Sequence, residues 1–270
     1  MTTTTTTTSK SFISFGCHGR HNAAAGSMSR RLKKWLDLWE GDPKEDTSSL
    51  SAVSPALERH FLELTADLSH SASVLVPLCG RSFDLAWLAQ QGLQVAGVEC
   101  SRRAIALFAA EQGFELHAGD SGGVEGAMIA WYAGPCTLFE GDWFDATPEL
   151  LGGCYDLAFD RDALMTVDPA RRRQYADVLT RMLRAGTRKS RLLVLAAEFE
   201  EASVDAAVTA LGPHSLSPAE IQDIFPDFSL EILSEEEAID TGAFSRLRRA
   251  GLRSIIQRAV LLKRENFLAY

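Results

Sequence analysis

A strand–loop–helix–strand pattern at residues 73–100 constrains the fold of this chain more than any other feature. It begins with VLVPL at residues 74–78, an apolar run of the length of a buried strand. A turn at residues 79–81 interrupts the run, and residues 82–92 have the apolar spacing and the final glycine of a short helix. A second apolar run follows and ends at Glu99. Two buried strands joined by a helix predict a parallel pair, and hence an open α/β sheet.

Glu99 stands at the carboxyl end of the second predicted strand, where open α/β sheets bind their ligands. A carboxylate there can accept hydrogen bonds from both hydroxyl groups of a ribose. The preceding loop, PLCGRS, has the single glycine Gly80, whereas a dinucleotide site needs G-x-G-x-x-G so that the backbone can approach a pyrophosphate. The pattern therefore favours a nucleoside cofactor without phosphate groups, and S-adenosylmethionine combines a ribose and an adenine with an amino-acid tail. The alternative interpretation is a buried strand pair that leaves Glu99 in solvent.

The rest of the chain also alternates between helical and strand patterns. An amphipathic helix is predicted at residues 30–40 and a second helix at residues 55–68, followed later by a hairpin that turns at residues 134–135. The last two predicted strands, at residues 228–233 and 254–262, are joined differently from the others. We therefore predict a Rossmann-like α/β fold: a mostly parallel, seven-stranded sheet with helices on both faces and an antiparallel final strand or strands.

Composition and charge exclude several classes of function. The net charge of −9 argues against a general nucleic-acid partner, and no apolar run is long enough to span a membrane. The six histidines show no metal-ligand spacing, so no metal site is expected. The five cysteines form no C-x-x-C pair, which indicates a reducing compartment and favours a cytoplasmic protein.

Residues 1–28 differ in composition from the rest of the chain, because they are rich in Thr, Ser and Ala and contain no acidic residue. Such a segment resembles a transit peptide, which would direct the protein to a mitochondrion or plastid. It can equally be a disordered extension ahead of an alternative start at Met28. Both interpretations place the folded part in one domain, predicted at residues 29–267.

Four segments of the chain together resemble the thiopurine S-methyltransferase family. They are VLVPLCGRSFDLAWLAQQG, LQVAGVECS, FEGDWFD and YDLAFDRDALMTVDPARRRQYADVL, and the similarity extends over roughly residues 32–265. It implies a class I methyltransferase that uses S-adenosylmethionine and acts, as a monomer, on a small soft nucleophile. The expected nucleophile is sulfur in a thiol or thiopurine-like acceptor, and a halide, thiocyanate, selenium or tellurium acceptor is the alternative. Outside methyl transfer, the alternatives are a non-catalytic cofactor-binding domain and a nucleotide-dependent oxidoreductase.

The resemblance also implies which residues form the site. Trp39, in a W-x-x-x-W pair with Trp35, matches a tryptophan that packs on the cofactor, although both tryptophans can equally be core anchors. Arg161 matches an arginine that faces cofactor and acceptor. Arg246 matches a second arginine on the acceptor side or, alternatively, is a solvated helix residue. The other implied cofactor contacts are the loop residues Leu78 and Gly80, the ribose-binding Glu99, and Asp142 and Trp143 beside the adenine.

Catalysis is expected to depend on the D-R-D-A-L motif. Arg161 can hold an anionic acceptor through charge-assisted hydrogen bonds, and Asp160 can accept a proton through water or else pair with Arg161. The acceptor half of the chain departs from the family pattern at two places. Residues 42–48 contain no aromatic side chain, and His214 and Ser215 stand where the family has a proline and a phenylalanine.

Overall fold

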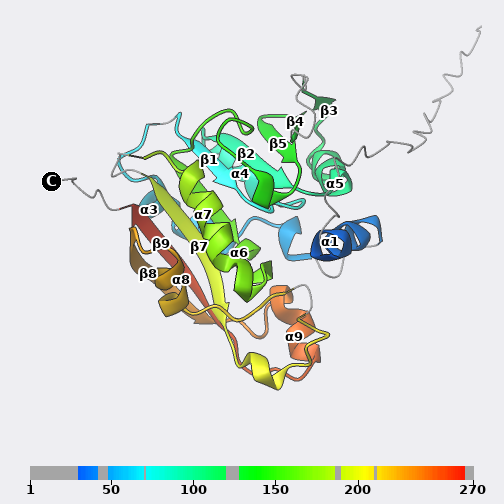
Figure 1. Cartoon of the computed structure of the whole chain (residues 1–270), viewed down its shortest axis with the longest axis vertical. Helices are drawn as coiled ribbons and strands as arrows, with labels where there is room; N and C mark the ends of the chain where they lie inside the picture. The colour runs from blue at the N-terminus through cyan, green and yellow to red at the C-terminus, as the bar shows by residue number, and fades with distance from the viewer. Residues whose placement is uncertain are drawn as a thin grey trace, which may run out of the picture.

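The computed structural model describes residues 30–41, 48–69, 71–119, 128–185, 190–209 and 212–264, so the predicted extension at residues 1–28 lies outside it. The described residues form one nine-stranded sheet in the order β3-β4-β5-β2-β1-β6-β7-β9-β8 (Figure 1). The strands are β1 (Ser73–Val76), β2 (Gln94–Glu99), β3 (Leu116–Ala118), β4 (Ile129–Ala133), β5 (Cys136–Glu140), β6 (Leu157–Arg161), β7 (Arg191–Glu198), β8 (Phe228–Glu237) and β9 (Ile256–Arg264).

The centre of this sheet is parallel. Strands β5, β2, β1, β6 and β7 run in one direction, and β9 lies antiparallel between β7 and β8. The prediction of a mostly parallel sheet with an antiparallel C-terminal strand is therefore confirmed. The sheet is wider than the seven strands expected, because β4 and β3 extend it through antiparallel pairs beyond β5. None of the three residues of β3 is buried, so its sequence carries no strand pattern.

Helices cover both faces of the sheet, as predicted. Leu75 of β1 and Val194 of β7 pack in the core that contains α6, α7 and α8, whereas their neighbours Val74 and Leu193 pack in the core that contains α2 to α5. Figure 1 looks onto the face that α6 and α7 cross. No helix in the described ranges is long and apolar enough to cross a bilayer. The helices are α1 (Arg30–Glu40), α2 (Pro55–Arg59), α3 (Phe61–Thr65), α4 (Asp84–Gln90), α5 (Arg102–Gln112), α6 (Ala163–Thr166), α7 (Arg172–Met182), α8 (Pro218–Ile224) and α9 (Ser245–Arg249), with short 3-10 turns η1 (Ser48–Ser51), η2 (Trp143–Asp145), η3 (Pro169–Arg171), η4 (Glu201–Ser203) and η5 (Gly242–Phe244).

Local interactions explain where several helices begin and end. The Ser101 side chain caps α5 by accepting a backbone hydrogen bond of 3.3 Å, and Gly113 ends this helix in the left-handed conformation at φ 70°. The helix predicted for residues 55–68 is instead two short helices, because the backbone leaves the helical conformation at His60. The buried His60 ring lies with Nε2 3.0 Å from Ser234 Oγ on β8, so this break places the ring against the sheet.

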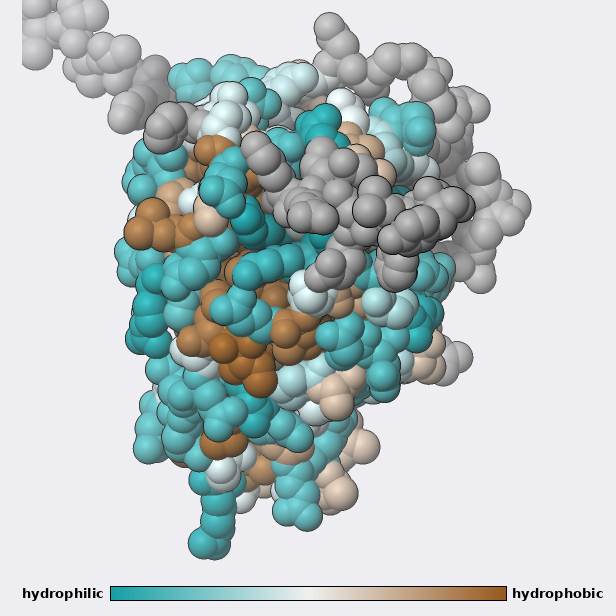
Figure 2. Space-filling model, turned by 90° about the vertical axis from the view of Figure 1, so that its left-hand side faces the viewer, coloured by the Kyte–Doolittle hydropathy of each residue, from teal (hydrophilic) through white to brown (hydrophobic). Residues whose placement is uncertain are grey.

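Strand β8 forms an exposed edge of the sheet. Figure 2 shows an apolar area among hydrophilic side chains on this side of the molecule, and Ile232 in β8 is 46% exposed. The strand also carries four glutamates, Glu231, Glu235, Glu236 and Glu237. Like charges along an edge strand oppose its pairing with the edge of a second sheet.

We predict that Phe108→Ala destabilises the fold without touching the carboxyl edge of the sheet. Phe108 is fully buried in α5 and makes an edge-on contact with Phe114, so its truncation should cost about 3–5 kcal/mol of unfolding free energy. Leu62→Ala is the control, because Leu62 is 78% exposed and its truncation should cost less than about 0.5 kcal/mol. Urea unfolding of both variants measures the difference, and equal losses would contradict the assigned core.

Candidate functional site

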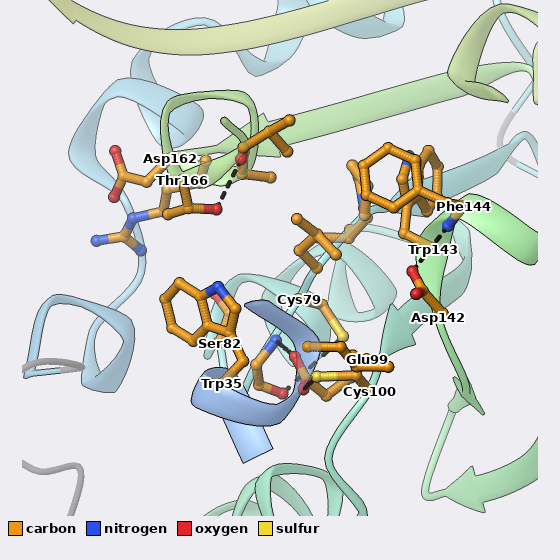
Figure 3. Close-up of a pocket in the computed structure, with 18 of the residues that line it drawn as sticks. Trp35, Cys79, Ser82, Glu99, Cys100, Asp142, Trp143, Phe144, Asp162 and Thr166 are labelled. Carbon is orange, nitrogen blue, oxygen red and sulfur yellow. Dashed lines mark hydrogen bonds between the residues drawn. The ribbon is translucent and has the colours of Figure 1, made fainter. Parts of the chain in front are cut away.

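The loops that follow β1, β2, β5 and β6 surround a pocket at the carboxyl edge of the sheet (Figure 3). Its unfilled space, counting the part that is open to solvent, is about 1190 Å³. Every residue predicted to contact the cofactor lines this pocket: Trp35, Trp39, Leu78, Gly80, Glu99, Asp142, Trp143 and Arg161. The fold therefore brings these residues together from α1, from the ends of three strands and from η2.

The Glu99 carboxylate joins two of these loops. Its Oε2 accepts a hydrogen bond from the backbone N–H of Gly80 (3.0 Å), and its Oε1 accepts one from Ser101 (2.8 Å) and one from the thiol of Cys100 (3.2 Å). Burial raises the pKa of Glu99, and these hydrogen bonds oppose that shift. Glu99 is 4% exposed and reaches the pocket, so the solvated alternative does not describe it.

Gly80 gives the floor of the pocket its shape. Its φ is +55°, and a Cβ atom at this position would lie 3.0 Å from Leu50 Cδ1 and 3.2 Å from Trp39 Cζ2. Leu78 also has a positive φ, of 46°, which is uncommon for a residue with a side chain. The backbone is therefore held in a tight turn against Trp39, which is 3% exposed and serves as a core anchor as well as a pocket residue.

Asp142, Trp143 and Phe144 form one end of the pocket (Figure 3). Asp142 Oδ1 accepts the backbone N–H of Phe144 (3.1 Å), and burial raises the pKa of this carboxyl. Trp143 is fully buried beside Tyr175, and its Nε1 has no hydrogen-bond partner among the described residues. The guanidinium of Arg171 lies 3.5 Å from the centre of the Phe144 ring and adds a cation at this end.

Arg161 is held by a carboxylate that the sequence analysis missed. Arg161 Nη1 donates to Asp84 Oδ2 (2.8 Å) and to the carbonyl oxygen of Ala52 (3.0 Å). The fully buried Asp84 also accepts from the backbone of Ser54 (2.7 Å) and the hydroxyl of Ser82 (2.8 Å). The signal that could have identified Asp84 is an acidic residue in the first turn of the mainly apolar helix DLAWLAQ.

Asp160 is not among the described residues that line the pocket. Its Oδ2 accepts the hydroxyl of Tyr175 (2.7 Å) and its Oδ1 accepts the backbone N–H of Leu164 (3.1 Å), so it holds α6 and α7 to the end of β6. Burial raises the pKa of Asp160 to about 6. The carboxylate bonded to Arg161 is that of Asp84, so the alternative pairing of Asp160 with Arg161 is not the arrangement found.

Arg246 likewise lies outside the lining of this pocket in the described part of the chain. Arg246 Nη2 donates to the carbonyl oxygen of Gly212. Gly212 packs against α6, because a Cβ atom there would lie 2.7 Å from Thr166 Cα, and His214 N donates to the carbonyl oxygen of Met165 (2.8 Å). Arg246 therefore holds the segment around Gly212, which packs against α6, and does not itself line the pocket among the described residues.

Several further lining residues were not predicted. They include Cys100, Asp162, Thr166, Asp168 and Arg171. Asp162 and Thr166 lie at the end of the pocket away from Asp142 and Phe144, whereas Cys79, Glu99 and Cys100 lie between the two ends (Figure 3). Five residues of the quoted D-R-D-A-L-M-T-V-D segment thus line the pocket besides Arg161 itself, and only their position after β6 indicates it.

The described residues fit a nucleoside that carries a cationic sulfur. Glu99 offers a buried carboxylate, Gly80 lets the Trp39 ring approach the turn closely, and Trp143 presents a flat wall. The lining also contains more acids than bases: Glu99, Asp142, Asp162 and Asp168 against Arg161 and Arg171. This excess favours a sulfonium cation, and the described residues include no group of three His, Cys, Asp or Glu side chains placed to bind a metal.

Comparison with known sequences identifies one family. The profile described as Thiopurine S-methyltransferase matches residues 30–265. A thiopurine S-methyltransferase of Pseudomonas putida (strain KT2440) is 33% identical over 212 residues, which cover 78% of this chain and 90% of that protein. A thiopurine S-methyltransferase of Bordetella petrii is 33% identical over 205 residues, which cover 76% of this chain and 86% of that protein.

Solved structures share the fold. Magnesium protoporphyrin IX methyltransferase from Synechocystis PCC 6803, with bound S-adenosylhomocysteine, has a TM-score of 0.57 at 14% identity and covers 87% of this chain and 100% of its own. Geranyl diphosphate C-methyltransferase from Streptomyces coelicolor A3(2) has a TM-score of 0.57 at 10% identity, covering 89% of this chain and 100% of its own. At such identities the similarity establishes the Rossmann-like methyltransferase fold and no more.

We predict that Glu99→Gln weakens binding of S-adenosylhomocysteine by roughly ten- to a hundredfold, because the loss of a charge-assisted hydrogen bond corresponds to about 1.5–3 kcal/mol. Glu140→Gln is the matched control: Glu140 stands opposite Glu99 on β5, accepts from Trp131 Nε1 (2.9 Å) and is not a lining residue in the described structure. Calorimetric titration measures both affinities. Equal affinities in the two variants would remove Glu99 from the site.

We also predict that Asp160 makes stability fall as the pH rises. Because burial raises its pKa from 3.8 to about 6, the unfolded chain loses this proton before the folded one does. Between pH 4 and pH 7 the wild type should therefore lose on the order of 2–3 kcal/mol of unfolding free energy relative to Asp160→Asn, which lacks the titrating group. Chemical unfolding of both proteins at the two pH values tests this, and a pH-independent difference would contradict it.

Proposed function

The chain belongs to the thiopurine S-methyltransferase family, and from this premise we propose that its pocket transfers the methyl group of S-adenosylmethionine to the sulfur atom of a small thiol or thiopurine-like acceptor. The family is one of S-adenosylmethionine-dependent methyltransferases whose acceptors are small molecules. The observation that carries the proposal is the buried Glu99 carboxylate at the end of β2, beside the turn at Gly80 and the Trp39 ring.

We assign cofactor binding to residues of α1 and to residues between the end of β1 and η2. Glu99 would accept hydrogen bonds from the ribose hydroxyls with the lone pairs that Gly80 and Ser101 leave. Asp142 and Trp143 would flank the adenine, since an acceptor and a flat ring suit its amino group and its face. Trp35 and Trp39 would close the site from α1, and Leu78 would contact the tail through its backbone.

The acceptor is assigned to the other end of the pocket, around Arg161. When bound, S-adenosylmethionine supplies an activated methyl group on a sulfonium, so the chain's own residues have to align the nucleophile and stabilise its anion. Alignment alone can contribute about 7–11 kcal/mol in such reactions. A thiolate is the reactive form of a thiol, and Arg161, fixed by Asp84, would hold it beside the methyl group. Arg246 would support this end through Gly212, and Asp160 through the start of α6.

We also propose the oligomeric state, the partners and the cellular location that the sequence predicts. The four glutamates of the edge strand β8 support a monomer, and the net charge of −9 speaks against nucleic acid as a partner. The cysteines of the described ranges, Cys79, Cys100, Cys136 and Cys154, are all free thiols, which supports a reducing compartment such as the cytoplasm. Residues 1–28, outside the described structure, would redirect the protein if they act as a transit peptide.

Two measurements test the proposal. Calorimetric titration should show that S-adenosylhomocysteine binds and that NAD does not, which separates a methyltransferase from an oxidoreductase. Mass spectrometry should then detect a methylated product from at least one acceptor in a panel of thiols, thiopurines, halides, thiocyanate, selenide and tellurite. Binding of S-adenosylhomocysteine without any product would favour a non-catalytic scaffold, and product from halide alone would contradict the sulfur assignment.

We predict that Arg161→Lys lowers the turnover number by roughly ten- to a hundredfold, because lysine keeps the charge but loses the planar fork that a guanidinium presents. Affinity for S-adenosylhomocysteine and the melting temperature should change little, since lysine can still pair with Asp84. Arg258→Lys is the control: Arg258 is as buried as Arg161 (14% against 12% exposed) and pairs with Glu198 and Glu235 instead.

The two variants separate a catalytic role from a structural one. If Arg161→Lys melts early and loses cofactor affinity together with rate, then Arg161 is a structural partner of Asp84. If its turnover number equals that of Arg258→Lys across the thiol panel, then the assignment to the acceptor end is wrong.

A further inference from the structure

Asp162 is placed unlike any other carboxylate in the described structure. It occupies the N-cap position of α6, yet no capping hydrogen bond is formed by its side chain in the described residues. Its φ is +64°, in the left-handed region that residues with side chains seldom adopt. Backbone strain of this kind persists where the surrounding structure enforces it, and it concentrates at functional sites.

One carboxylate oxygen of Asp162 has no partner. Oδ1 is buried and accepts no hydrogen bond from the described residues, although a buried polar atom left in this state costs about 1–3 kcal/mol. Asp162 also lines the pocket beside Arg161, at the end away from Asp142 (Figure 3). A strained backbone, an unused cap position and an unpartnered oxygen therefore coincide at the acceptor end.

The other carboxylates near this end are occupied. Asp84 accepts from Arg161, Ser54 and Ser82, and Asp160 accepts from Tyr175 and Leu164 outside the lining. On the assumption that the proposed function holds, we propose that Asp162 is the general base of the reaction and that its carboxylate takes the proton of the acceptor's thiol. This differs from the sequence-based expectation, in which Asp160 accepts the proton through water.

The proposed step balances in atoms and charge. The S–H bond of the acceptor breaks and its proton moves to the Asp162 carboxylate, while the sulfur lone pair forms a bond to the methyl carbon. The bond between that carbon and the sulfonium sulfur breaks, and its electron pair stays on that sulfur, giving two neutral thioethers. The proton then leaves Asp162 to solvent, since this residue is partly exposed.

The surroundings of Asp162 increase the basicity of its carboxylate. Burial raises the pKa of Asp162, the neighbouring Asp84 carboxylate raises it further, and the Arg161 cation lowers it. A carboxylate whose affinity for protons is increased is a better general base than an exposed one. Arg161 beside it would stabilise the thiolate as the proton departs.

Asp162→Asn tests this inference, because asparagine has nearly the same shape and also tolerates a left-handed backbone. Turnover numbers are measured with two acceptors: an alkyl thiol, which is protonated at neutral pH, and an aromatic thiol that is already largely ionised. The alkyl thiol should react on the order of a hundredfold more slowly in the variant, and raising the pH should restore its rate. The ionised thiol needs no base, so its rate should change less than about threefold. Asp145→Asn is the control, because Asp145 is exposed and is not among the described lining residues.

Other outcomes overturn the inference. Equal losses with both thiols, without recovery at high pH, would mean that Asp162 only positions Arg161. Unchanged rates with both thiols would mean that it has no part in the reaction. Affinity for S-adenosylhomocysteine is measured alongside, so that a loss of folding or cofactor binding is recognised separately. A wild-type protein that methylates neither these thiols nor any other acceptor would overturn the proposed function together with this step.

Discussion

The hydrogen bonds that converge on the Glu99 carboxylate determine the shape of the site. One oxygen holds the turn after β1 through Gly80 N, and the other holds the start of α5 through Ser101 N. Burial alone would disfavour this charge, so the carboxylate and the two loops stabilise each other. The turn in its left-handed conformation then admits the Trp39 ring from α1, which closes the floor of the pocket. A substitution at Glu99 thus acts on cofactor affinity and on loop geometry together.

Within the half of the pocket that we propose binds the cofactor, one short segment was predictable from local rules, whereas the other residues followed from the resemblance to the family. A strand, a single-glycine turn and a strand ending in an acid indicate Gly80 and Glu99 without any knowledge of the tertiary structure, and the resemblance to the family added Leu78. The acceptor half depends on contacts between distant segments. Asp84 and Arg161 form an ion pair although they are 77 positions apart in the sequence, and no local pattern encodes that pairing. For the same reason the sequence left open whether Asp160 accepts a proton or pairs with Arg161, whereas in the structure its side chain is turned toward Tyr175. The width of the sheet was underestimated because the three residues of β3 carry no apolar alternation.

The two ends of the pocket divide the chemistry between them. Toward η2, a carboxylate, a tryptophan and an arginine stacked on Phe144 form a wall suited to a flat base. Toward α6, Asp84, Arg161 and Asp162 place one cation between two acids, so the pocket can both hold an anion and receive a proton. The segment at Gly212 packs behind α6 and is anchored by Arg246, which links this end to α9. Under the proposed assignment, the differences from the family at His214 and Ser215 lie near the end that would hold the acceptor and away from the end that would hold the cofactor.

We propose above all that the Glu99 carboxylate, while it holds Gly80, also binds the ribose of the cofactor. A crystal structure of the protein with S-adenosylhomocysteine tests this most directly. We predict that the ligand lies between Trp39, Glu99 and Asp142, that its ribose hydroxyls contact Glu99, and that the hydrogen bond from Gly80 N to Glu99 persists. A ligand bound elsewhere, or a Glu99 side chain in this pocket that makes no contact with the ribose, would contradict it.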